Sequence, residues 1–99
     1  MNDITHLTLQ KPPVFLFCAV EGDLLMRVLK QGLNRRKMPF IVMYESEYVA
    51  RRKLPFKKSP VVLTVLSEMM AEDGYQFAHA ETGEWVTDET PAKYLRICG

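Results

Sequence analysis

The chain has 99 residues, 47% of them hydrophobic and 25% charged, and its formal net charge at pH 7 is +1. These values are typical of one small soluble domain, and they exclude binding to nucleic acid or membranes through overall charge alone. No apolar run reaches the length of a membrane-spanning helix, so we expect no membrane association. Cys18 and Cys98 lack the spacing of metal ligands or of a disulfide framework, and the N-terminus lacks a signal-peptide pattern. We therefore expect a cytoplasmic protein with reduced thiols and no metal site.

Residues 1–10 are expected to form a loose lead-in, and residues 11–99 a single domain. Continuous apolar runs predict strands, and apolar side chains at helical spacing predict helices. Asp23, Ser46 and Ser67 are expected to cap the helices that follow them, because short polar side chains satisfy the first backbone N–H groups of a helix. In chain order we expect a strand at 14–18, a helix at 23–31, a strand at 40–44, a helix at 47–53, a strand at 59–66, a helix at 68–73, strands at 75–79 and 84–87, and a final helical turn at 90–95.

The run over residues 59–66 is expected to be the centre of the sheet. It is unbroken, rich in β-branched side chains and opened by Pro60. A strand that does not alternate polar and apolar residues is usually covered on both faces. The element order predicts an α+β fold, a small mixed sheet with short helices.

Charge is unevenly distributed along the chain. Residues 35–58 contain eight Lys or Arg residues and two acids, whereas seven acids and two cations follow residue 66. Cations gathered in this way indicate phosphate contacts with nucleic acid or docking to an acidic protein surface, although a solvated surface is an equally open interpretation. The candidate binding residues are Arg35, Arg36, Lys37, Arg51, Arg52, Lys57 and Lys58. We leave open whether the basic and acidic parts pair in a homodimer.

Four segments of the chain resemble a known family. They read Pro12-Pro13-x-Phe15-Leu16, Lys30-Gln31-Gly32-Leu33, residues 59–65 (Ser-Pro-Val-Val-Leu-Thr-Val) and Glu81-x-Gly83-x-Trp85-x-Thr87. Together they resemble the C-terminal lobe of bacterial RNA 2′-phosphotransferases over residues 11–97. The resemblance implies an ADP-ribosyltransferase-like fold, which in that family binds NAD and ADP-ribosylates an internal RNA 2′-phosphate. A separate winged-helix lobe precedes it in the family, and we expect no counterpart of that lobe in these 99 residues.

The chain departs from the family at the positions that carry its chemistry. The family's His-Gly-Thr tripeptide, which begins the NAD site, corresponds to Cys18-Ala19-Val20 here. Residues 38–44 (Met-Pro-Phe-Ile-Val-Met-Tyr) replace the family's Arg-His-x-Val-His-Leu-Ser. Residues 56–58 (Phe-Lys-Lys) replace its Arg-His-Gly, and residues 82–87 (Thr-Gly-Glu-Trp-Val-Thr) replace its Asn-Gly-Val-Trp-Leu-Thr. The positions that pack the sheet are kept, whereas those that bind NAD and phosphate are replaced. Because function resides in the site and not in the fold, the fold is expected to carry over and the activity is not.

Two residues could still support NAD chemistry. The resemblance places Glu84 close to the position where other ADP-ribosyltransferase clades carry a catalytic glutamate, and Tyr44 where a ring could stack on nicotinamide. The alternative is that Glu84 faces solvent and Tyr44 is a core or rim aromatic. Cys18, His6 and His79 are expected to be packed or surface side chains, because no motif supplies a partner for nucleophilic or metal chemistry.

Two functions are therefore predicted. The preferred one is a non-catalytic binding or regulatory protein, a pseudoenzyme of inhibitor or immunity type that acts through the basic residues and needs no cofactor. The alternative is a minimal NAD-dependent ADP-ribosyltransferase that uses Glu84 and Tyr44. The fold predicts a cleft bordered by Cys18, Val42 and Glu84, which apolar side chains such as Phe40 or Phe56 would fill if no dinucleotide enters.

Overall fold

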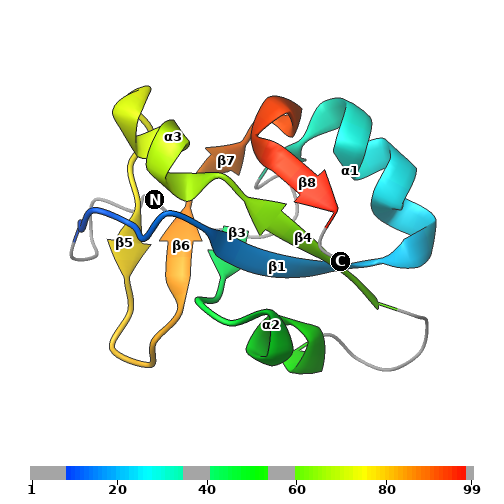
Figure 1. Cartoon of the computed structure of the whole chain (residues 1–99), viewed down its shortest axis with the longest axis horizontal. Coiled ribbons are helices and arrows are strands. Elements are labelled where there is room, and N and C mark those ends of the chain that lie inside the picture. The colour runs from blue at the N-terminus through cyan, green and yellow to red at the C-terminus, as the bar shows by residue number, and fades with distance from the viewer. Residues whose placement is uncertain (1–8, 35–40, 54–59, 98–99) are drawn as a thin grey trace.

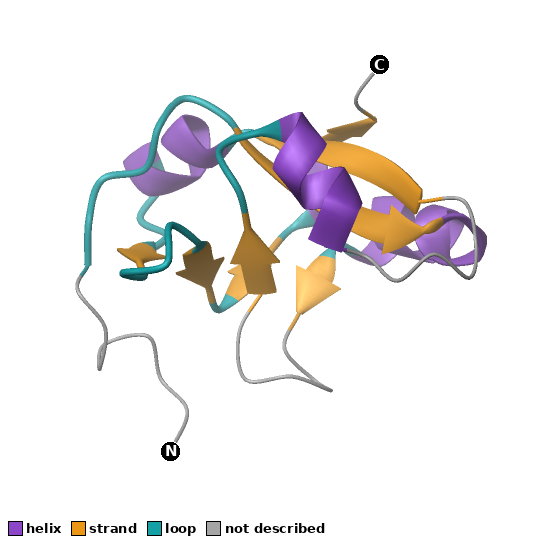
Figure 2. Cartoon of the chain, turned by 90° about the horizontal axis from the view of Figure 1, so that it is seen from below, coloured by secondary structure: helices purple, strands orange, loops and turns teal. Residues whose placement is uncertain are grey.

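The computed structural model describes residues 9–34, 41–53 and 60–97. Short helices lie on different sides of a group of short strands (Figures 1 and 2), which confirms the α+β class. The elements are β1 (Leu16–Glu21), the 3-10 turn η2 (Gly22–Leu24), α1 (Leu25–Gln31), β2 (Leu33–Asn34), β3 (Ile41–Met43), α2 (Glu47–Lys53), β4 (Pro60–Val65), α3 (Ser67–Glu72), β5 (Ala78–His79), β6 (Trp85–Thr87), β7 (Glu89–Thr90), the 3-10 turn η3 (Ala92–Tyr94) and β8 (Leu95–Ile97).

The predicted central strand is central. β4 lies between β1 and β8, and both pairings are antiparallel. Val62, Leu63 and Val65 of this strand are buried, as expected for a run that packs on both sides. A second antiparallel sheet has the order β3-β6-β5, and the short strands β2 and β7 form a two-stranded pair.

In the described part of the chain, an isolated β-bridge joins the two three-stranded sheets. The backbone N–H groups of Phe17 and Tyr44 each donate to the other residue's carbonyl oxygen at 2.8 Å. Phe17 belongs to β1, and Tyr44 follows the last residue of β3. This bridge fixes Tyr44 at the junction of the two sheets, beside the strands that carry the predicted site residues.

Two of the three predicted caps are corrected by the structure. Ser46 does cap α2, since its hydroxyl oxygen accepts from the Val49 N–H at 3.4 Å. Asp23 instead lies inside the turn η2, and α1 begins after Leu24 without a side-chain cap. Ser67 is fully buried, and its hydroxyl donates to the carbonyl oxygens of Pro13 at 2.8 Å and Val14 at 3.3 Å. A buried hydroxyl requires a partner, and these carbonyls supply it in place of the helix backbone.

Beside a small buried cluster of Ala78 and Val86, a main core holds the sheets and helices together. Its largest fully buried side chains include Phe77, Leu16, Ile41 and Met43. At its edge the Tyr94 hydroxyl donates to the Asp73 carboxylate at 2.5 Å, which joins η3 to the end of α3. This hydrogen bond, together with burial and the Asp73 charge, raises the pKa of Tyr94 to about 12. Among the described residues, no helix is long and apolar enough to cross a membrane.

Candidate functional site

Two neighbouring cavities lie beside the bridge between β1 and β3. The first, which we call the apolar cavity, has a volume of about 320 Å³ and is lined mainly by residues 18–20 of β1 together with Leu33, Ile41, Val42 and Ala50. The second, the polar cavity, has a volume of about 530 Å³ and is lined by Glu45, Ser46, Val49, His79, Thr82, Gly83 and Glu84. Tyr44 and Lys53 line both cavities. We call the two together the cleft.

The three residues that were expected to border one cleft are divided between the two cavities. Cys18 and Val42 line the apolar cavity, and Glu84 lines the polar cavity. The volume of each cavity falls within the size range of small-molecule sites, which are concave and carry few polar groups. Phe40 and Phe56, the side chains named as able to fill it, lie outside the described residues.

Tyr44 and Glu84 are brought to the same cavity from separate elements. Tyr44 is held by the bridge to Phe17, and Glu84 follows the tight turn between β5 and β6. The Glu84 carboxylate accepts a hydrogen bond from the Thr82 hydroxyl at 2.5 Å, which fixes its position. Burial, followed by the negative charge of Glu84, raises the pKa of the Tyr44 phenol. The two groups are therefore close enough to interact electrostatically, and Tyr44 stays protonated at neutral pH.

Cys18 occupies the position where the resemblance places the first residue of the NAD tripeptide. Its side chain is only 5% exposed and lies on β1, opposite Leu63 of β4. Burial raises the pKa of the thiol from 9.0 to about 12. The thiol is therefore neutral at physiological pH, and a neutral thiol is neither a nucleophile nor an anchor for phosphate.

We expect Cys18 to be unreactive in the native protein. In a Cys98→Ser background, a thiol reagent such as DTNB at about pH 8 should modify Cys18 only after denaturation, because the thiolate is the reactive form.

The raised pKa of Cys18 also implies that the stability of the protein is sensitive to alkaline pH. The protonated thiol contributes stability that is complete below pH 9.0 and is lost as the pH rises toward about 12.

Urea unfolding across this alkaline range measures that loss. The free energy of unfolding of Cys18→Ala should decline less steeply with pH than that of the parent protein, because the variant loses the Cys18 contribution and keeps that of Tyr94. Rapid modification of Cys18 in the native state would contradict the assignment of a buried neutral thiol.

A third group of side chains extends from the lining of the polar cavity, and the sequence did not reveal it. His79 stacks on Trp85 with ring centroids 4.2 Å apart and planes at 7°. Its Nδ1 lies 3.1 Å from Oε1 of Gln10, and its Nε2 lies 3.8 Å from Oε2 of Glu45. The same Glu45 oxygen accepts from Nε1 of Trp85 at 2.7 Å. His79 is packed, as expected, but it also has polar partners that are too distant in sequence to show as a motif.

The predicted basic residues fall largely outside the described part of the chain. Arg35, Arg36, Lys37, Lys57 and Lys58 cannot be placed, whereas Arg51 and Arg52 are exposed on α2. Arg51 forms the expected i,i+4 ion pair with Glu47 at 3.4 Å. Arg52 donates to the Tyr48 hydroxyl at 3.2 Å and lies 5.4 Å from the centre of its ring. The basic surface therefore stays a prediction. In the described residues, no group of three or more His, Cys, Asp or Glu side chains is arranged to hold a metal ion.

Comparison with known proteins finds relatives that match most of this chain. Over 84 residues the chain is 33% identical to the RNA 2′-phosphotransferase of Escherichia coli strain K12. The aligned residues are 85% of this chain and 46% of that protein. Over 94 residues it is 29% identical to a probable RNA 2′-phosphotransferase of Burkholderia pseudomallei, covering 95% of this chain and 51% of that protein. The chain is homologous to RNA 2′-phosphotransferases. No protein-family model matches it.

The predicted resemblance to RNA 2′-phosphotransferases is thereby confirmed, and it extends over most of this chain. The chain spans about half the length of the curated relatives it matches. The homology relates this chain to part of an RNA 2′-phosphotransferase, and the activity of the whole enzyme does not follow from it. What the cleft does must be argued from its own residues.

Proposed function

We propose that this chain is a non-catalytic binding or regulatory protein, a pseudoenzyme that retains part of an RNA 2′-phosphotransferase scaffold. It acts on a macromolecular partner, RNA or an acidic protein, through the basic residues Arg35, Arg36, Lys37, Arg51, Arg52, Lys57 and Lys58. A protein of inhibitor or immunity type would act in this way, by binding its partner without catalysis. The observation that carries the proposal is the apolar lining of the cleft at residues 18–20.

The apolar cavity does not fit the pyrophosphate of a dinucleotide. Its side chains from β1 are those of Cys18, Ala19 and Val20, and the Cys18 thiol is buried and neutral. Of the described side chains that line this cavity, Lys53 is the charged one. Phosphate recognition uses several charge-assisted hydrogen bonds, and Lys53 alone among these side chains supplies one, so replacing a His-Gly-Thr tripeptide with apolar groups weakens binding of NAD.

Titration with NAD tests this proposal. We expect no heat of binding by calorimetry at millimolar NAD and no nicotinamide release in the same samples. The Escherichia coli relative, assayed in parallel with an RNA that carries a 2′-phosphate, is the positive control. Saturable binding together with turnover would contradict the proposal.

A second function is supported by one specific observation, the shared position of Tyr44 and Glu84. Both line the polar cavity, and the Glu84 charge contributes to the raised pKa of Tyr44. In a minimal NAD-dependent ADP-ribosyltransferase, nicotinamide would leave the ribose carbon, and the Glu84 carboxylate would stabilise the positive charge that develops there. The acceptor nucleophile would then take the ADP-ribose.

The two functions are separated by Glu84→Gln. This change keeps the size of the side chain and removes its charge, so any nicotinamide release by the parent protein should fall by about 100-fold if Glu84 is catalytic. Glu81→Gln is the matched control, since Glu81 lies in the same turn, is exposed and does not line the cavity. Equal loss in both variants would point to a general effect on the turn.

A further inference from the structure

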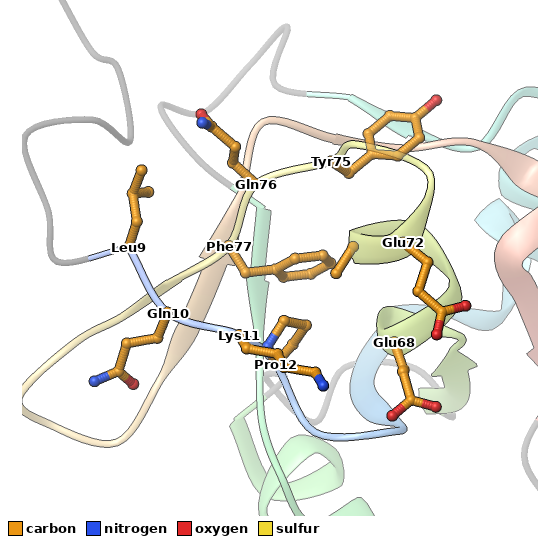
Figure 3. A pocket seen from close by; sticks show the side chains of 10 residues that line it. Leu9, Gln10, Lys11, Pro12, Glu68, Glu72, Tyr75, Gln76 and Phe77 are labelled. Carbon is orange, nitrogen blue, oxygen red and sulfur yellow. The ribbon is translucent and has the colours of Figure 1, made fainter.

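A groove lies outside the cleft, between the first described residues, α3 and the segment before β5. Its volume is about 440 Å³, and its lining includes Leu9, Pro12, Ala71, Tyr75 and Phe77. The Phe77 ring occupies the centre of this groove, between α3 and the Pro12 ring (Figure 3). A backbone hydrogen bond of 3.0 Å from the Gln10 N–H to the Phe77 carbonyl holds the two walls together. The floor of the groove is therefore apolar and fixed.

One rim of the groove is acidic. Glu68 and Glu72 lie four residues apart on α3, and both carboxylates project from the same side of the helix (Figure 3). Within the described residues neither carboxylate takes part in an ion pair, although Lys11 lines the groove as well. Two like charges at this spacing repel each other weakly, and an incoming cation relieves that repulsion.

Exposed apolar side chains lie near the groove, Leu9 on the wall opposite α3 (Figure 3) and Val14 and Met69 beside or on α3. Leu9 is 42% exposed, Val14 is 49% exposed and Met69 of α3 is 52% exposed. Val14 adjoins the rim because its carbonyl oxygen accepts from the Glu68 N–H at 3.2 Å. Adjacent exposed apolar side chains beside a groove are typical of an interaction site. The chemistry of this surface favours an occupant that is apolar and basic.

The outer face of α2 has the complementary character. Tyr48 is 65% exposed, and Arg51 and Arg52 follow it in the last turn, whereas Val49 and Lys53 line the cleft. The opposite face of the helix packs on the protein through Ala50. The ion pair of Arg51 with Glu47 is solvent-exposed and therefore weak, so it can be exchanged for an intermolecular one. α2 thus presents an exposed aromatic side chain followed by two cations.

We propose that α2 of one copy of this chain docks into the groove of a second copy. Tyr48 then packs on Leu9, and Arg51 and Arg52 face Glu68 and Glu72. α2 and α3 lie on different sides of the strands (Figure 1), so one molecule cannot fill its own groove. The contact joins two different surfaces, and it therefore adds further copies until a ring closes.

This contact goes beyond the proposed function and has a regulatory consequence for it. Arg51 and Arg52 also belong to the basic residues proposed to bind the macromolecular partner. A copy whose α2 is docked cannot offer these two side chains to that partner. Self-association and partner binding therefore compete, and self-association prevails at high protein concentration.

Analytical ultracentrifugation of charge variants tests the contact. The parent protein should associate progressively with concentration at low salt and become monomeric in about 1 M NaCl, where the Debye length is about 3 Å. Glu68→Lys/Glu72→Lys and Arg51→Glu/Arg52→Glu should each weaken association by about 100-fold, because like charges then face each other. An equimolar mixture of the two variants should associate again, because opposite charges are restored at every contact. Circular dichroism checks that each variant is folded.

Glu81→Lys/Glu89→Lys is the matched control, since it makes the same change in charge at exposed positions outside the groove. Its association should equal that of the parent protein or differ only slightly. A monomeric parent protein at all concentrations would overturn the proposal, as would a variant mixture that stays monomeric. Binding of a synthetic basic amphipathic peptide to a groove that does not self-associate would assign the groove to a foreign segment instead. Glu68→Lys/Glu72→Lys leaves the proposed partner-binding residues unchanged, so failure of self-association and failure of partner binding remain distinguishable.

Discussion

Gly32→Ala is expected to lower the free energy of unfolding by about 3 kcal/mol. Gly32 follows α1 with a φ of +76°, a backbone conformation that L side chains rarely adopt. A Cβ at this position would lie 2.5 Å from the carbonyl oxygen of Thr90 and 2.8 Å from the backbone nitrogen of Ala92. Both are backbone atoms, so neither can move aside as the end of a side chain would.

Gly74→Ala provides the matched control for this prediction. Gly74 also has a positive φ, of +104°, but a Cβ there would have no atom within 4 Å. Its replacement should cost only the conformational strain, about 1 kcal/mol. Thermal unfolding should therefore show a fall in Tm of about 15 °C for Gly32→Ala and about 5 °C for Gly74→Ala. Equal shifts would show that residues 90–92 are not packed against Gly32.

Reversing the charges of the seven basic residues is expected to abolish binding of the chain to a polyanionic partner. A fluorescently labelled single-stranded RNA is the probe, at protein concentrations too low for self-association. Phosphate contacts release counterions, so the affinity of the parent protein should fall steeply with salt and that of the variant should be undetectable. Unchanged binding after all seven reversals would contradict the proposed surface. Absence of RNA binding by the parent protein would leave an acidic protein as the partner.

Two pairs of cations on short helices refine this experiment. Arg51→Glu/Arg52→Glu changes α2 within the proposed surface, whereas Arg27→Glu/Lys30→Glu makes the same charge change on exposed residues of α1. The α2 pair should reduce RNA affinity by about 10-fold or more, and the α1 pair by about twofold. Similar losses for both pairs would indicate attraction by net charge without a defined surface.

Local patterns in the sequence were sufficient to predict the strands and helices whose formation depends on residues close together in the chain. The continuous apolar run of β4 indicated a strand packed on both sides, and the structure places it between β1 and β8. The Ser46 cap and the Glu47–Arg51 pair of α2 were also predictable, because their partners are three and four residues apart. β8 was missed because its three residues form a strand only by pairing with β4.

The candidate site depends on contacts between distant segments, and its prediction was correspondingly less complete. The positions of Cys18, Val42 and Glu84 around the cleft followed from the resemblance to a known fold. The partners of His79, in contrast, come from residues 10, 45 and 85, and no spacing rule joins them. Ser67 shows the same effect in reverse, because tertiary packing gave its hydroxyl partners 53 and 54 residues away in place of the expected cap.

The assembly of the central sheet constrains how the protein folds during its synthesis. Its three strands come from residues 16–21, 60–65 and 95–97, so every pairing in it joins segments far apart in the chain. Contacts of such high sequence separation form slowly. While the ribosome has yet to release residues 95–97, the apolar strand β4 has one neighbour and an open edge. Such an edge is prone to pair with other nascent chains, so we expect productive folding to be sensitive to chaperone supply.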